Sequence, residues 1–199
     1  MLSKKTVFVL LATLSLLLSI GYYFFLLRDH LAAKPLTVLG QVTDFRLTDS
    51  LERQFSLEEL KGKIWVADFI FTTCGGICPV MTQNMSQIYK SFRDDETVHF
   101  VSVSVNPEYD TPAVLAQYSQ KYSADPGRWH FLTGPREIIE HLAVNGFKVG
   151  SAEEPVFHSA YFILVDRQAR IRQYYEGTQK ETIGKIKSDI ELLLAEKGK

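Results

Sequence analysis

The sequence predicts an α/β sandwich, in which helices cover a sheet that contains strands buried on both faces. Two near-continuous apolar runs, 64–71 and 98–105, are rich in β-branched and aromatic residues, as is typical of such strands. Segments with helical spacing of apolar residues follow each run, and a strand pair and an amphipathic helix end the chain. This succession of strands and helices is the pattern of a layered α/β domain.

Length and composition favour one folded domain with an added anchor. The chain has 199 residues, of which 46% are hydrophobic and 12% aromatic, which is enough for a packed core. The formal net charge is -1 at pH 7. Because no global positive field is present to release counterions from a polyanion, nucleic acid is not expected as a partner.

An uncharged apolar segment near the N-terminus predicts a single transmembrane helix. Residues 6–27 contain no charged side chain and are long enough to span the hydrocarbon core of a bilayer, which needs about 20 residues. Lys4 and Lys5 precede the segment, so the positive-inside rule places residues 1–5 in the cytoplasm. We therefore expect a single-pass protein of the cell membrane, with its C-terminal domain on the extracytoplasmic side.

The alternative interpretation of this segment is a cleaved signal peptide. The apolar part of a signal peptide is usually about 7–15 residues long, which is shorter than the segment seen here. Leu31-Ala32-Ala33 resembles a cleavage site, but the polar residues 28–30 intervene, which favours retention. Both interpretations export the domain, which we place at 38–199, after a linker at 28–37.

The first elements of the domain are short. Residues 41–47 alternate polar and apolar side chains and precede turn-forming residues at 48–50, which predicts an N-terminal β-hairpin. Ser56 can cap a helical turn at 57–60, with Glu59 completing a capping box.

The remaining elements follow from apolar periodicity. Strands are expected at 64–71 and 98–105, and helices at 80–92, 111–122 and 135–147. The last expected elements are a strand pair, 159–166 and 171–175, and a helix from Thr178 onward.

The two cysteines of the chain, Cys74 and Cys78, lie between a predicted strand and a predicted helix. A disulfide between them would close too short a loop to stabilise the fold much, so the spacing favours chemistry over structure. Pro79 suits the first turn of a helix, and a helical conformation would place the two sulfur atoms on one side, one turn apart. A helix N-terminus also stabilises thiolate, so the pair can hold a metal ion or cycle through a disulfide.

Two thiolates favour Cu(I), Cu(II) or Zn(II), and an imidazole as third ligand would suit copper. Among five histidines, His158 lies directly before the strand at 160–165, at a loop-to-strand boundary. The other four histidines occupy ordinary positions. Position alone leaves two readings of His158 open, a metal ligand and a structural histidine.

Four motifs together resemble the SCO/SenC family of copper-binding cytochrome c oxidase assembly proteins. They occur at 71–79, 104–112, 129–134 and 158–166. The resemblance extends from Val38 to the C-terminus and implies a thioredoxin-like fold. It also implies that Cys74, Cys78 and His158 bind one copper ion, as Cu(I) or Cu(II).

This chain departs from the family pattern at two places. Gly75-Gly76-Ile77 stands where many members have Pro-Asp-Val, and Asn106 stands where many have Asp. A carboxylate near the site is therefore missing, which affects the tuning of the metal site and the thiol pKa rather than the ligand set. The other conspicuous residues are expected to be structural: Met81 and Met85 as core side chains, Trp129 as a packed aromatic, and 110–112 as a helix start.

Two functions remain open. The first is a copper chaperone that delivers its ion to the CuA centre of cytochrome c oxidase subunit II, with anchoring to raise the encounter rate. The second is a thiol-disulfide oxidoreductase, in which Cys74 and Cys78 reduce the cysteines of that centre and are themselves restored by thiol-disulfide reductants. The three-residue spacer and the absence of a proline directly before the strand at 159–166 favour metal binding.

Overall fold

The computed structural model describes residues 13, 15–23, 35–150 and 159–196 of the chain. It divides into two units, Met1–Pro35 and Leu36–Lys199. In the first unit residues 15–23 are helical, and nowhere in the described ranges is a helix both long and apolar enough to cross a bilayer. Much of the predicted anchor at 6–27 and of the linker lies outside the described residues, so both stay predictions.

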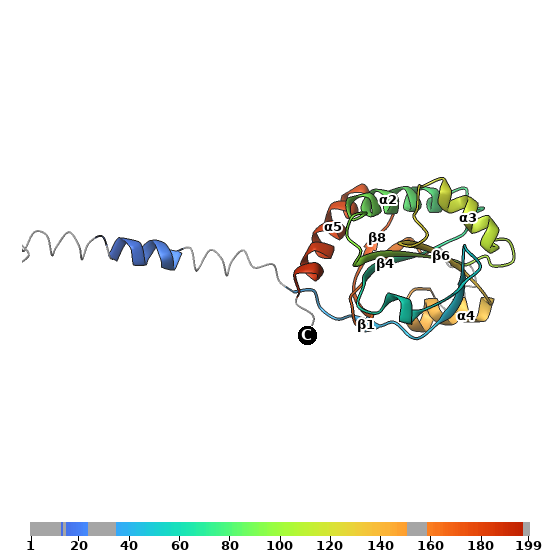
Figure 1. Ribbon diagram of the computed structural model, residues 1–199, viewed down its shortest axis with the longest axis horizontal. Helices are drawn as coiled ribbons and strands as arrows, with labels where there is room; N and C mark the ends of the chain where they lie inside the picture. Colours follow the sequence, from blue (N-terminus) through green and yellow to red (C-terminus); the bar gives the residue numbers. More distant parts are fainter. Residues whose placement is uncertain (1–12, 14, 24–34, 151–158, 197–199) are drawn as a thin grey trace, which may run out of the picture. The chain divides into compact units, whose positions relative to one another are not determined.

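The second unit is built on one mixed sheet of eight strands (Figure 1). The strands lie in the order β1-β8-β7-β4-β5-β6-β2-β3. Their bounds are β1 Gly40–Gln41, β2 Arg46–Asp49, β3 Gln54–Ser56, β4 Ile64–Ile70, β5 Val98–Ser104, β6 Trp129–Thr133, β7 Tyr161–Val165 and β8 Arg170–Glu176.

The two predicted central strands are confirmed. Strands β4 and β5 are parallel, with Ile64 opposite Val98 and Ile70 opposite Ser104, and every residue of both is buried. Strand β7 runs antiparallel to β4 on its other side. Because both faces of the central strands are covered, their sequences are continuously apolar rather than alternating.

Helices cover both faces of the sheet (Figure 1). One face carries α2 (Ile77–Ser91), α3 (Pro112–Gln120) and α5 (Lys180–Ala195), and the other carries α4 (Arg136–His141) with its π-helical extension η2 (Leu142–Gly146) and the single 3-10 turn η1 (Leu57–Leu60). The expected core roles of Met81, Met85 and Trp129 are confirmed, since all three are fully buried on the α2 side.

The predicted hairpin is confirmed, but its boundaries were wrong. Thr48 and Asp49, predicted to form the turn, are the last residues of β2. The buried Asp49 carboxylate accepts hydrogen bonds from the backbone N–H groups of Leu51 and Arg53, both at 2.9 Å. The turn therefore lies after Asp49, and Asp49 itself belongs to the strand. The capping box of Ser56 and Glu59 is present as predicted.

One strand was not predicted. Strand β6 pairs parallel with β5 and antiparallel with β2, and all five of its residues are buried. Its short sequence contains a histidine and a terminal threonine, so it offered no long apolar run. The helix expected at 135–147 is present, and its second half has π-helical geometry.

Candidate functional site

Cys74 lies at the end of the central strand, in a tight turn. Strand β4 ends at Ile70, and the N–H of Cys74 donates to the carbonyl of Phe71 at 3.2 Å. Helix α2 begins only at Ile77, after Gly76 with φ -111 and ψ -107. The two cysteines are therefore not joined by one helical turn, because the two glycines let the chain leave helical geometry between them.

Cys78 lies in the first turn of α2 and is buried, with 4% of its surface exposed, whereas Cys74 is half-buried. The carbonyl of Cys78 accepts a hydrogen bond from the Thr82 hydroxyl at 2.9 Å, and that hydroxyl lies 2.9 Å from the Tyr118 hydroxyl. These buried groups fix the first turn of α2 against α3. Both cysteines are free thiols.

The pKa values of the two thiols are shifted in opposite directions. Burial raises the pKa of Cys74, but hydrogen bonds from the backbone of Cys78 and Gly76 and from the Cys78 thiol outweigh it, so the net effect lowers this pKa. Burial raises the pKa of Cys78 to about 12, assisted by its thiol hydrogen bond to Cys74 and by the charge of Asp68. The pair can therefore carry one thiolate, on Cys74, with the Cys78 proton directed at it.

Asp68 is a fully buried carboxylic acid in β4, and neither of its oxygen atoms has a hydrogen-bond partner among the described residues. Burial raises its pKa to about 7. A second carboxylate, Asp110, is also fully buried but is well bonded. It accepts hydrogen bonds from the Thr72 N–H at 3.0 Å, from the Thr72 hydroxyl and from the Ser104 hydroxyl at 2.5 Å.

Sequence reasoning assigned Asp110 to a helix start and missed its contact with the cysteine turn. Thr111 does cap α3, accepting from the N–H of Val114. The contact with Thr72 arises because the carboxyl ends of the parallel strands β4 and β5 meet at the same sheet edge. Because both strands were predicted, their parallel pairing could have indicated that the loop after β5 lies beside the cysteine turn.

His158 lies outside the described residues, so its distance from the cysteines is not part of the structure. The first described residue after it is Ser159, two residues before β7 begins. Because β7 is antiparallel to β4, its first residues lie at the sheet edge where β4 ends. Ala160 approaches α2 there, since its carbonyl accepts from Gly177 at 2.6 Å and a Cβ on Gly177 would lie 3.0 Å from Met81 Cε.

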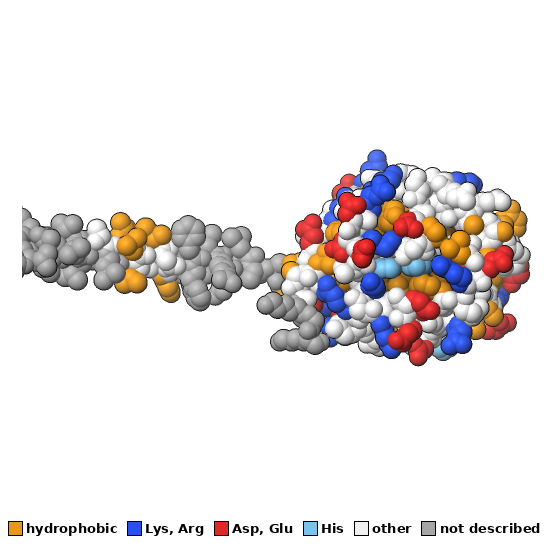
Figure 2. Space-filling view, viewed as in Figure 1, with side chains coloured by type: hydrophobic (Ala, Val, Ile, Leu, Met, Phe, Trp, Pro, Cys, Tyr) orange, Lys and Arg blue, Asp and Glu red, His pale blue; other side chains and the backbone are white. Residues whose placement is uncertain are grey.

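His99 and His130 form a pair at the other end of the sheet, near the first residues of β5 and β6. The Nδ1 of His99 lies 3.2 Å from the Nε2 of His130, and each residue is 8% exposed. Figure 2 shows histidine surface flanked by Lys and Arg side chains. Burial is the main cause that lowers both pKa values to about 4. The charges of Lys63 and Arg128 add to it at His99, and the charge of His99 adds to it at His130, so the pair is neutral at pH 7. Within the described ranges no three Cys, His, Asp or Glu side chains cluster as a metal site, and this pair has no third ligand there.

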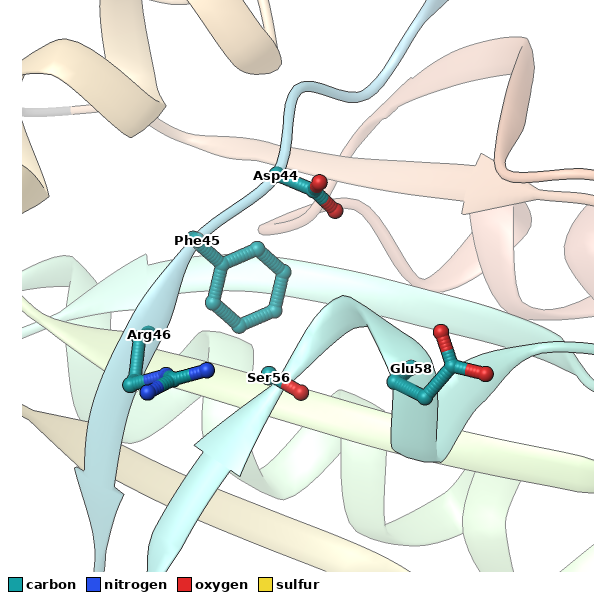
Figure 3. A pocket seen from close by; sticks show the side chains of 5 residues that line it. All are labelled: Asp44, Phe45, Arg46, Ser56 and Glu58. Carbon is teal, nitrogen blue, oxygen red and sulfur yellow. The ribbon is translucent and has the colours of Figure 1, made fainter.

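A pocket of about 490 Å³ lies on the hairpin side of the sheet (Figure 3). Its lining combines acidic, basic and apolar side chains: Asp44, Phe45, Arg46, Ser56 and Glu58. It contains no sulfur or imidazole ligand, so the thiol pair is the stronger candidate for the functional site.

Comparisons with known proteins agree with this geometry. The SCO1/SenC family model matches residues 37–195. A Bacillus subtilis protein described as an SCO1 protein homolog is 35% identical over 156 residues, which cover 75% of this chain and 81% of that protein.

Two solved structures have the same fold. BsSco, described as a member of the Sco family of cytochrome c oxidase assembly proteins, matches with a TM-score of 0.71 and 34% identity, over 81% of this chain and 98% of that chain. Bradyrhizobium japonicum ScoI, solved with copper bound, matches with a TM-score of 0.60 and 25% identity, over 74% of this chain and 98% of that chain.

Proposed function

Because this chain belongs to the SCO1/SenC family, as its motifs predicted, we propose that it is a membrane-anchored, extracytoplasmic copper chaperone. It binds one copper ion through Cys74, Cys78 and His158 and delivers it to the CuA centre of cytochrome c oxidase subunit II. The observation that carries this proposal is a pair of free thiols, one half-buried and one buried, in the turn between the central strand β4 and the start of α2. ScoI with copper bound and BsSco, from an oxidase assembly family, support it.

The ligand chemistry fits copper as cargo. Sulfur ligands are soft, and an imidazole completes a set that suits both Cu(I) and Cu(II). Cys74 is half-buried and is the more acidic thiol, so it offers a thiolate to an incoming ion, while the Cys78 proton must leave when the second sulfur binds. The half-buried sulfur also leaves the ion accessible for transfer by ligand exchange.

His158 is assigned as third ligand by the family resemblance and by its place in the topology. Ser159, the next residue along the chain, lies two residues before β7, and β7 begins beside the end of β4. Residues 6–27 are proposed as the transmembrane anchor and 28–37 as its linker, with residues 1–5 in the cytoplasm.

A thiol-disulfide oxidoreductase is the second candidate, favoured by the unequal acidities of the thiols. In that reaction the Cys74 thiolate attacks one sulfur of the acceptor disulfide and releases the other as a thiolate, which gives a mixed disulfide. The Cys78 sulfur, after losing its proton, then attacks Cys74 and releases the second acceptor thiolate. The acceptor gains two electrons, and Cys74 and Cys78 end as a disulfide that an external dithiol must reduce.

Copper titration separates the two candidates. The reduced full-length protein in detergent micelles is titrated with Cu(II), and with Cu(I) against a competing chelator. We expect one equivalent of bound copper and a sulfur-to-Cu(II) charge-transfer band. His158→Ala should lose affinity by tenfold or more, while His141→Ala, which changes an exposed histidine of α4, should bind as wild type does.

Three outcomes would contradict the proposal. If His158→Ala binds copper as tightly as wild type, the third ligand is wrong. If wild type binds no copper but rapidly reduces disulfides, the oxidoreductase function replaces the chaperone. If loaded protein transfers no copper to the isolated CuA domain of subunit II, the acceptor is wrong.

A further inference from the structure

Asp110 joins the loop after β5 to the turn that carries Cys74. Its carboxylate is fully buried and accepts from both the N–H and the hydroxyl of Thr72, two residues before the cysteine. We infer that Asp110 is a positioning residue, which holds the 71–74 turn in the conformation that brings Cys74 to Cys78. The inference rests on the proposed function, because it concerns the same thiol pair.

After Cys74, backbone groups of Gly76 and Cys78 contact its sulfur, but no side chain packs against the two glycines in between. Neither Gly75 nor Gly76 has another atom within 4 Å of the place where a Cβ would lie. The N-cap of α2 at Gly76 has no side-chain hydrogen bond. The contact between Thr72 and Asp110 therefore adds a restraint on the strand side of Cys74, in the turn that begins at Phe71.

The same turn serves both sulfur atoms. The carbonyl of Phe71 accepts from the N–H of Cys74 at 3.2 Å, and the Phe71 backbone lies close enough to the Cys78 sulfur to lower the pKa of that thiol. Thr72 is the next residue, so a change in its backbone torsions moves both contacts of Phe71. Holding Thr72 thus holds the separation and the hydrogen bonding of the two thiols.

Asp110 is itself firmly held, which a positioning residue requires. The Ser104 hydroxyl donates to its carboxylate at 2.5 Å and accepts from the N–H of Asn106 at 3.1 Å. The N–H of Asp110 donates to the carbonyl of Asn106 at 2.9 Å. Thr111 then starts α3, so the carboxylate is fixed between the end of β5 and the first turn of a helix.

The test compares Thr72→Val with Thr72→Ser in the full-length protein. Valine keeps the shape and removes the hydroxyl, while serine keeps the hydroxyl. The first readout is the rate of Cys74 alkylation by iodoacetamide at neutral pH, and the second is copper affinity with the charge-transfer band. Loss of an outer partner of a metal ligand typically costs about 10–100-fold in affinity, so we expect about a tenfold loss in Thr72→Val, a shifted band and altered alkylation, with rescue in Thr72→Ser.

Asp110→Asn is the second variant, expected to reproduce both effects. Its thermal unfolding is followed alongside, and Thr72→Val carries the test if this variant does not fold. Wild-type alkylation and copper spectra in a folded Thr72→Val protein would overturn the inference and leave the proposed function intact. If wild type itself binds no copper, the proposed function fails, and the alkylation rates alone decide whether Asp110 positions Cys74.

Discussion

Arg172 is the buried cation whose removal should destabilise the domain most clearly. It is 4% exposed and donates five hydrogen bonds: two to the carbonyl of Leu36, one to Asp166 and two to Glu196. One guanidinium therefore joins β8 both to Leu36, where the second unit begins, and to Glu196, directly after α5. Arg172→Leu keeps an apolar stem of similar length and removes all five bonds.

The expected cost follows from what the substitution leaves behind. Removing one partner of a buried ion pair costs about 3–5 kcal/mol. Asp166 keeps its bond from Arg170 Nε at 2.8 Å, and the Glu196 side chain is 36% exposed and can reach water, so the lower end applies. About 3 kcal/mol lowers the Tm of a domain of this size by about 6–12 °C.

Thermal unfolding followed by tryptophan fluorescence measures this shift, since Trp65 and Trp129 are both fully buried in the sheet. The matched control is Arg136→Leu, which breaks the exposed pair between Arg136 and Glu108. Exposed pairs contribute little, so the control should melt close to wild type. If Arg172→Leu melts no lower than this control, the network around Arg172 does not stabilise the fold and the reasoning is refuted.

Two further predictions concern other parts of the domain. Because the pKa values of His99 and His130 are lowered to about 4 from 6.5, the folded protein binds fewer protons than the unfolded chain between these values, and stability is lost as the pH falls through this window. In urea unfolding of the His99→Gln, His130→Gln double variant, the free energy of unfolding should depend less steeply on pH, by about 1 kcal/mol per pH unit for each histidine. An unchanged slope would show that the two histidines do not cause the loss of stability at low pH. Gly177→Ala would place a Cβ 3.0 Å from Met81 Cε and 3.1 Å from the Ala160 carbonyl, so it should destabilise by about 1–3 kcal/mol. Gly184→Ala, in α5 with open space around it, should stabilise by up to about 1 kcal/mol, and equal effects of the two alanines would contradict the packing argument.

The central sheet and the place of the thiols could be predicted because their signals are local and long. The runs at 64–71 and 98–105 needed no partner to identify them, and Cys74 follows the first run directly. The parallel pairing of β4 and β5 then explains why the loop after β5 reaches the cysteine turn.

What could not be predicted depends on contacts between distant segments. Strand β6 exists because β5 and β2 both pair with it, although its own sequence is short. The departure of Cys74 from helical geometry depends on the backbone torsions of Gly76, which the spacing of the cysteines does not encode. The thiol acidities depend on burial in the folded state, which separates Cys78 from Cys74 although both occupy one short motif.

Because of the departures from the family pattern, the position of Cys74 should depend more strongly on the contact between Asp110 and Thr72. Two glycines stand between the cysteines, and Asn106 supplies an amide where many relatives have a carboxylate, so neither feature restrains or charges the site. The backbone carbonyl of Asn106, which any residue would offer at this position, accepts from the N–H groups of Tyr109 and Asp110. The carboxylate that reaches the cysteine turn comes from Asp110, four residues later. Restoring a stiffer spacer, as in Gly75→Pro, should therefore reduce the effect of Thr72→Val on Cys74 alkylation, and an undiminished effect would mean that the glycines do not create the dependence on Asp110.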